Sequence, residues 1–155
     1  MGDLQLEVQW ALPKTADMPA DEDLARWVSA TLEAVQHQGP AELTLRIVDE
    51  VEGRALNAQW RDRDRATNVL SFPLELPAHA GIPYLGDLVI CAPVVAGEAA
   101  EQGKSLQAHW AHLCVHGTLH LLGHDHEQPG EAGQMEALEV QILAALGYPD
   151  PYEPA

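Results

Sequence analysis

Six of the eight histidines of this 155-residue chain lie in one segment, residues 109–128, with the sequence HWAHLCVHGTLHLLGHDHEQ. On an α-helix, His116 and His120 would be one turn apart on the same face, so their imidazoles could bind one ion. Gly123 can adopt the left-handed conformation that ends a helix, and His126 could then supply a third nitrogen. Three protein ligands with an open fourth position are typical of catalytic zinc. We therefore predict one zinc ion, or another divalent metal ion in its place, at these three histidines.

The spacing His-x3-His-x5-His, with a glycine seven residues after the first histidine, equals that of the metzincin peptidases. Those enzymes place a glutamate directly after the first histidine as the general base. This chain has Gly117 at that position. The metal ligands are therefore expected without the peptidase base, which predicts a metal-dependent hydrolase that obtains its base elsewhere.

Other polar residues of the segment could act near the ion. His112, one turn before the first ligand, could stand behind a ligand or shuttle protons, or could be a helix-surface residue. Asp125 could orient a ligand imidazole by accepting its N–H, or could belong to a turn. His124 is a weaker ligand candidate than His126, because the glycine spacing singles out His126. His109 is expected to be structural.

The remaining sequence predicts the elements that would hold this segment. Apolar residues that alternate along the chain predict strands, and apolar residues at helical spacing predict helices. The predicted strands are 4–10, 43–47, 69–74 and 85–91. The predicted helices are one that Asp21 or Asp23 could cap and that ends near Gly39-Pro40, one from Asp49 to near Trp60, and three over 93–102, 106–122 and 130–146. This is an α/β pattern, and the helix between the first two strands indicates that they are parallel. The strand order beyond that pair stays open.

The charge balance is strongly acidic, with 8 Lys and Arg against 24 Asp and Glu and a formal net charge of −16. Such a chain should repel RNA on average. Arg61, Arg63 and Arg65, however, concentrate part of the positive charge, although a solvated loop explains them equally well. No apolar run approaches the roughly 20 residues that span a bilayer, so no membrane partner is expected. Cys91 and Cys114 lie in apolar stretches and are predicted to be buried free thiols.

Residues 116–126, HGTLHLLGHDH, closely resemble the signature of the YbeY family of bacterial endoribonucleases, also called rRNA maturation factors. The resemblance continues in TNVLSFPLE (67–75), LGDLVICAP (85–93) and MEALEVQILAALGYPDPY (135–152). It implies a single domain over residues 1–155 of α/β (α+β-like) class, in which helices surround a small mixed sheet and a zincin-like helix binds the metal.

The resemblance also implies the site and its substrate. Zinc would be bound by His116, His120 and His126, and the family arginine upstream of TNVLSFP, which serves RNA cleavage, corresponds to Arg61. The implied activity is cleavage of single-stranded RNA in 16S rRNA 3′-end maturation and ribosome quality control in the cytoplasm. The implied partners are rRNA and the small ribosomal subunit or one of its proteins. One position departs from the family pattern, because His124 stands where a tyrosine is usual.

For phosphodiester hydrolysis, the guanidinium of Arg61 would neutralise charge that develops on the phosphate. Arg63 and Arg65 would hold the RNA backbone nearby. Asn68 and Ser71 could donate hydrogen bonds to phosphate, or could equally cap the end of a strand.

Two other functions compete with this hypothesis. The chain could be a non-catalytic ribosome-assembly factor whose metal only holds the fold, in which case the metal-free protein would unfold. It could also be a metallopeptidase, as the histidine spacing suggests, but the missing glutamate argues against that activity.

Overall fold

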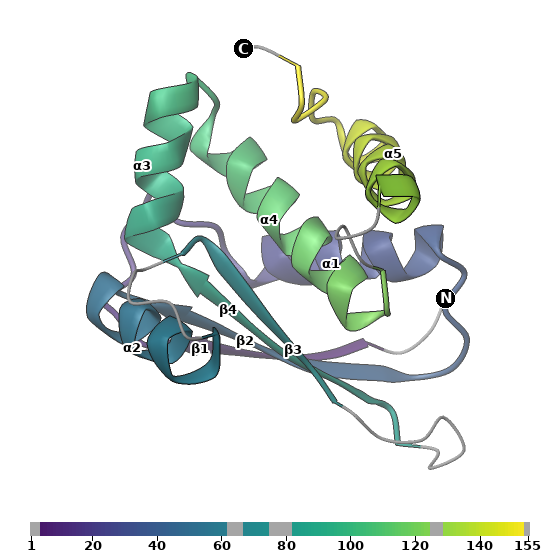
Figure 1. Cartoon of the computed structure of the whole chain (residues 1–155), viewed down its shortest axis with the longest axis horizontal. Coiled ribbons are helices and arrows are strands. Elements are labelled where there is room, and N and C mark those ends of the chain that lie inside the picture. Colours follow the sequence, from purple (N-terminus) through teal and green to yellow (C-terminus); the bar gives the residue numbers. More distant parts are fainter. Residues whose placement is uncertain (1–3, 62–66, 75–81, 125–128, 154–155) are drawn as a thin grey trace.

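The computed structural model of the chain (Figure 1) describes residues 4–61, 67–74, 82–124 and 129–153, without the side chains of Arg61 and Pro129. In chain order the elements are β1 (Leu4–Trp10), α1 (Asp21–Ala34), β2 (Ala41–Val48), α2 (Glu50–Arg61), β3 (Val69–Pro73), β4 (Tyr84–Cys91), α3 (Ala92–Gln102), α4 (Leu106–Leu121) and α5 (Pro129–Leu146). Within these ranges, no helix combines the length and the apolar character that crossing a bilayer requires.

The four strands form one mixed sheet in the order β1-β2-β4-β3. Strands β1, β2 and β4 are parallel, which confirms the parallel pair predicted for the first two strands. Strand β3 is antiparallel to β4 and forms one edge of the sheet. The predicted fold class, a small mixed sheet with helices around it, is confirmed.

The two faces of the sheet are covered differently (Figure 1). Helices α1 and α4 pack on one face, where the alternate residues Leu43, Leu45 and Ile47 of β2 are buried. Helix α5 packs against α1 and α4. The other face carries a smaller apolar cluster, whose buried members are Val48, Leu70, Val89 and Cys91, with Leu56 of α2 packed against it. The main core therefore lies between the sheet and the helix that carries the histidines.

The ends of α1 differ from the sequence prediction. Asp21 and Asp23 both lie within the helix, and Ala20 occupies the N-cap position. The carboxylate of Asp23 accepts the backbone N–H of Ala20 at 3.2 Å, so this aspartate stabilises the first turn from inside. The helix ends at Ala34, earlier than the predicted Gly-Pro pair, because Gln36 adopts a positive φ of 57° that reverses the chain.

Candidate metal centre

Three histidines form a row along α4. The ring centroids of His112 and His116 are 6.1 Å apart, and those of His116 and His120 are 4.8 Å apart. Both pairs are four residues apart, which places them on one helix face. The predicted juxtaposition of His116 and His120 is therefore present in the structure.

The ends of α4 are fixed by local hydrogen bonds. The hydroxyl of Ser105 accepts the backbone N–H of Ala108 at 3.0 Å, which caps the first turn. Beyond the last turn, Gly123 has φ 96° and the N–H of His124 donates to the carbonyl of Leu119 at 3.0 Å. The predicted left-handed glycine is thus present, and it turns the chain back directly after the histidine row.

The opposite side of α4 is packed into the core. Cys114 lies there as a buried free thiol, and burial raises its pKa to about 12. Gly117 contacts the sheet so closely that a Cβ atom would lie 2.8 Å from Cδ2 of Leu88 and 3.3 Å from Cγ2 of Val69. No side chain fits there without movement of a neighbour. The close packing of α4 on β3 and β4 therefore disfavours the glutamate of the metzincin pattern, which would have to displace the side chain of Leu88.

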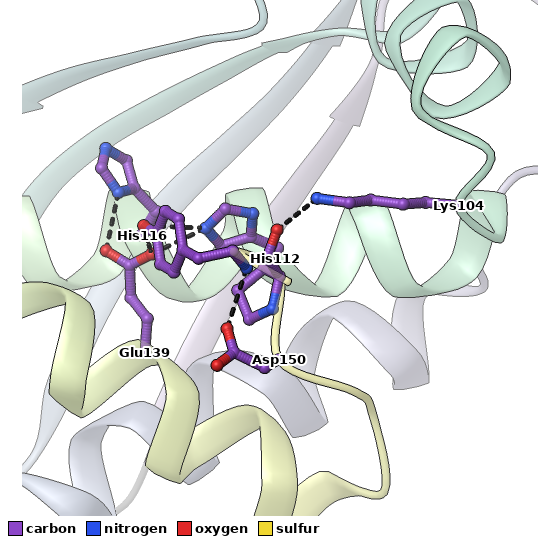
Figure 2. Close-up of polar contacts among 7 residues, drawn as sticks. Lys104, His112, His116, Glu139 and Asp150 are labelled. Atoms are coloured by element: carbon purple, nitrogen blue, oxygen red, sulfur yellow. Dashed lines mark hydrogen bonds and ion pairs between the residues drawn. The ribbon is translucent and has the colours of Figure 1, made fainter. Parts of the chain in front are cut away.

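Glu139 of α5 faces the histidine row and was not among the predicted site residues. Its side chain is wholly buried. Each carboxylate oxygen accepts a hydrogen bond from a different histidine: Oε1 lies 2.6 Å from Nε2 of His112, and Oε2 lies 2.9 Å from Nδ1 of His116. The hydroxyl of Tyr152, which follows α5, also donates to Oε1 at 2.5 Å. Figure 2 shows His112 and His116 of α4 beside Glu139, which reaches them from α5.

The carboxylate of Glu139 is kept charged by its donors. Burial alone raises the pKa of this group, but the hydrogen bonds from His112 and His116 and the partial charge of His116 outweigh it and lower the pKa to about 2. A carboxylate only accepts hydrogen bonds, so each histidine nitrogen that faces it carries a proton. For Tyr152, burial and the contact with Glu139 raise the pKa of the hydroxyl, which therefore stays a donor.

His112, His116 and Glu139 together form a group that could hold a metal ion, since their donor atoms lie within 4.8 Å of one another. Their spacing is that of hydrogen bonds, however. Two atoms bound about 2.0–2.1 Å from a tetrahedral zinc lie roughly 3.3 Å apart, whereas the carboxylate contacts measure 2.6 and 2.9 Å. The geometry favours Glu139 as the acceptor behind His116, whose Nε2 is then directed away from the carboxylate.

The sequence held one signal for Glu139. Met135, Ile142 and Leu143 of α5 are buried, and Glu139 falls among them at core-facing helical spacing. A lone carboxylate on the apolar side of a helix requires a partner, because burying an unpaired charge is strongly unfavourable. That partner could have been sought among the histidines of the preceding helix.

A second histidine–glutamate contact lies near the start of α4. His109 is buried, and its Nε2 lies 2.9 Å from Oε1 of Glu98 on α3. Burial lowers the pKa of His109, against the opposing effect of Glu98. The amide of Asn68 donates to the same carboxylate at 3.0 Å, and its oxygen accepts the N–H of Val69. This contact joins α3, α4 and β3, in agreement with the structural role expected of His109.

The structure places the other predicted residues as follows. Ser71 on β3 donates its hydroxyl to the carbonyl of Gly117 on α4 at 3.4 Å. The main chain of Arg61 ends α2, which packs on the other face of the sheet from α4. Four predicted residues lie outside the described ranges: Arg63, Arg65, Asp125 and His126.

Comparisons with known proteins agree with the sequence motifs. A family model described as "Endoribonuclease YbeY" matches residues 12–147. The "Endoribonuclease YbeY" of Stutzerimonas stutzeri is 59% identical over 150 residues, which cover 96% of this chain and 91% of that protein. The protein of the same name from Alkalilimnicola ehrlichii is 58% identical over 151 residues, with 96% and 91% covered.

A solved structure shares the fold. The solution structure of TM1509 from Thermotoga maritima aligns with a TM-score of 0.59 at 22% identity, and the alignment covers 96% of this chain and 99% of that one. At this identity the likeness concerns the fold alone. The family model and the relatives, by contrast, match nearly the whole sequence. They show that this chain belongs to the endoribonuclease YbeY family.

Proposed function

We propose that this chain is a zinc-dependent endoribonuclease for single-stranded RNA, with its metal ion held by His116, His120 and His126. Membership in an endoribonuclease family supports hydrolysis of RNA phosphodiester bonds as the reaction. One observation carries the metal assignment: His116 and His120 stand 4.8 Å apart between ring centroids, and His116 is held from behind by the buried Glu139. In this proposal one domain, residues 1–155, carries the activity.

The residues on α4 fit a zinc ion. Imidazole nitrogens are common zinc ligands, and a ligating histidine usually donates its other N–H to a carboxylate, as His116 does to Glu139. Zinc bound there would act as a Lewis acid that polarises a phosphoryl oxygen of the RNA. Other divalent ions that bind imidazole are the alternative. His112 would act behind the ligands through Glu139, and His124 would line the approach to the ion. Asp125 would orient a ligand imidazole by accepting its N–H.

The arginines near the end of α2 would act on the RNA itself. Arg61 would neutralise charge on the reacting phosphate with a guanidinium that stays protonated, and Arg63 and Arg65 would hold the backbone on either side. Asn68 and Ser71 already donate hydrogen bonds within the protein, to Glu98 and to the carbonyl of Gly117. They would have to break these bonds to donate to a phosphate. Only Asn68 fits the second predicted role at a strand end, because its side-chain oxygen accepts the N–H of Val69 at the start of β3, whereas Ser71 lies within β3 (Val69–Pro73).

The physiological substrate in this proposal is the 3′ end of 16S rRNA, with a further role in ribosome quality control in the cytoplasm. A net charge of −16 disfavours binding to free RNA. The small ribosomal subunit, or one of its basic proteins, would supply the complementary charge and restrict cleavage to RNA presented on the ribosome.

The two competing functions receive less support. A metallopeptidase would need a base at position 117, where this chain has glycine and a Cβ atom would lie 2.8 Å from Cδ2 of Leu88. A purely structural metal is disfavoured because α4 and α5 are already joined through Glu139 by hydrogen bonds within the protein. We therefore expect the chelator-treated protein to stay folded and to lose RNA cleavage.

The test compares the wild-type chain with Arg61→Ala and His120→Ala on single-stranded 16S rRNA fragments, with zinc content measured in each preparation. Arg26→Ala and His37→Ala, which alter the same residue types on or next to α1, are the matched controls. We expect both site variants to fall to background cleavage, with zinc lost only in His120→Ala. Equal cleavage by all five proteins would indicate a contaminating nuclease and overturn the proposal.

A further inference from the structure

We propose that Glu139 is a positioning residue that fixes the ring of His116 with Nε2 toward the metal, and that Tyr152 in the C-terminal segment holds Glu139 in place. This inference rests on the proposed metal site. It extends that site to α5 and to the residues after it, neither of which contains any of the three proposed ligands.

The carboxylate of Glu139 is enclosed by the protein. Its side chain has no exposed surface, and it receives donors from His112, His116 and Tyr152. A buried carboxylate is stable only when such donors surround it. The group therefore cannot turn toward another partner without leaving one of these donors unpaired.

The contact with Glu139 selects one tautomer of His116. The carboxylate accepts a hydrogen bond from Nδ1 of His116. In a neutral ring the proton is therefore held on Nδ1, and the lone pair is on Nε2. The two nitrogens lie on opposite sides of one ring carbon, so Nε2 is directed away from Glu139. The side chain of His116 is 23% exposed, so the ring is partly open to solvent, unlike the carboxylate behind it.

The C-terminal segment is tied down at several points around this carboxylate. Lys104 donates to the carbonyl of Pro151, and the backbone N–H of Tyr152 donates to Asp150 at 2.8 Å. The Tyr152 ring packs edge-on against His112, with 5.4 Å between centroids. These contacts bring the hydroxyl to Glu139, and they make residues 150–152 part of the support of the site.

The experiment uses the full chain in zinc-loaded and chelator-treated form. Zinc affinity is measured by competition with a chromophoric chelator for wild type, Glu139→Gln, Tyr152→Phe and His120→Ala. Glu98→Gln is the matched control, because it makes the same change in the other histidine–glutamate contact. In the chelator-treated chains, nitrogen NMR of the imidazole rings reports which nitrogen of His116 carries the proton.

We expect Glu139→Gln to lower zinc affinity by about 10- to 100-fold and to shift the His116 proton away from Nδ1. Tyr152→Phe should show both changes in the same direction and to a smaller extent, whereas Glu98→Gln should match wild type. This tautomer change is not expected of a residue that only stabilises the fold.

Two results would overturn the inference. Unchanged affinity and tautomer in Glu139→Gln would show that the carboxylate does not position His116, and if that variant fails to fold, unchanged values in Tyr152→Phe lead to the same conclusion. Zinc loss as complete as in His120→Ala would make Glu139 a ligand. If the wild-type chain binds no zinc, the proposed function fails, and the tautomer measurement still decides whether Glu139 holds His116.

Discussion

Helix α4 carries two histidine–glutamate clusters that use the same residue types in opposite ways. Near its start, His109 is the buried partner, with a side chain 5% exposed, and Glu98 is 31% exposed. About two turns further on, Glu139 is the buried partner with no exposed surface, and His116 is 23% exposed. The first cluster encloses the histidine, and the second encloses the carboxylate.

This difference decides what each cluster can do. Burial lowers the pKa of His109 and favours its neutral form, and its Nδ1 has no hydrogen-bond partner among the described residues. That ring is closed off and serves packing. Around Glu139, the donors keep the carboxylate charged and leave His116 at the boundary of the protein. A buried carboxylate with a half-buried histidine is therefore the arrangement suited to ligand binding.

The largest expected loss of stability comes from replacing each of the two glutamates by alanine. Glu139→Ala removes the acceptor of His112, His116 and Tyr152. Leaving these donors without their acceptor in a buried site, together with the cavity left by the side chain, should lower the free energy of unfolding by about 3–5 kcal/mol. Glu98→Ala should lower it by only about 1–2 kcal/mol, because water can reach the place of the partly exposed carboxylate. Urea unfolding with chelator present measures both. Equal losses would show that burial does not distinguish the clusters.

The stability of the folded chain should depend on pH because Glu139 is held in its charged form. The pKa of Glu139 is lowered from 4.5 to about 2 in the folded chain. Its stabilisation is therefore fully present above pH 4.5 and is lost as the pH falls toward 2, by about 3 kcal/mol in all. Glu139→Gln should flatten the unfolding free energy across this window, whereas Glu98→Gln should keep the wild-type profile. Two superimposable profiles for wild type and Glu139→Gln would contradict the assignment.

Much of the fold could be predicted because the signals are local. The alternation of Leu43, Leu45 and Ile47 predicts a strand, and the spacing of His116 and His120 predicts a shared helix face. Both follow from the geometry of a single element. The burial of Cys114 was predictable for the same reason, since apolar residues surround it along the chain.

The role of Glu139 depends on packing between two elements, which is why the sequence prediction missed it. Along α5 a glutamate is a common residue on a solvated face, and its distance in sequence from His116 carries no information about contact. Only the packing of α5 against α4 brings the carboxylate to Nδ1. The position of β3 at the edge of the sheet was open for the same reason, because strand order depends on contacts distant in sequence.

Gly117→Ala should disturb the two ends of α4 unequally. The added Cβ would meet Leu88 at 2.8 Å, beside His116, and overpacking of this kind lowers the free energy of unfolding by about 1–3 kcal/mol. Gly97→Ala on α3 is the matched control. Nothing lies within 4 Å of its Cβ position, and alanine favours the helix by up to about 1 kcal/mol. NMR should show shifted His116 ring signals and unshifted His109 signals in Gly117→Ala. Shifts of equal size would mean that α4 moves as one rigid body.

The smallest expected effect tests whether Tyr152 acts through Glu139 alone. Tyr152→Phe removes one donor and should lower the free energy of unfolding by about 1 kcal/mol. In a Glu139→Gln background this loss should shrink, because the two residues share one hydrogen bond, whereas in a Glu98→Gln background it should add in full. Urea unfolding of the wild-type chain, the three single variants and the two double variants completes both cycles. Additivity in both backgrounds would mean that the tyrosine stabilises the chain by packing on His112, and the two clusters would then differ only in the burial of their carboxylates.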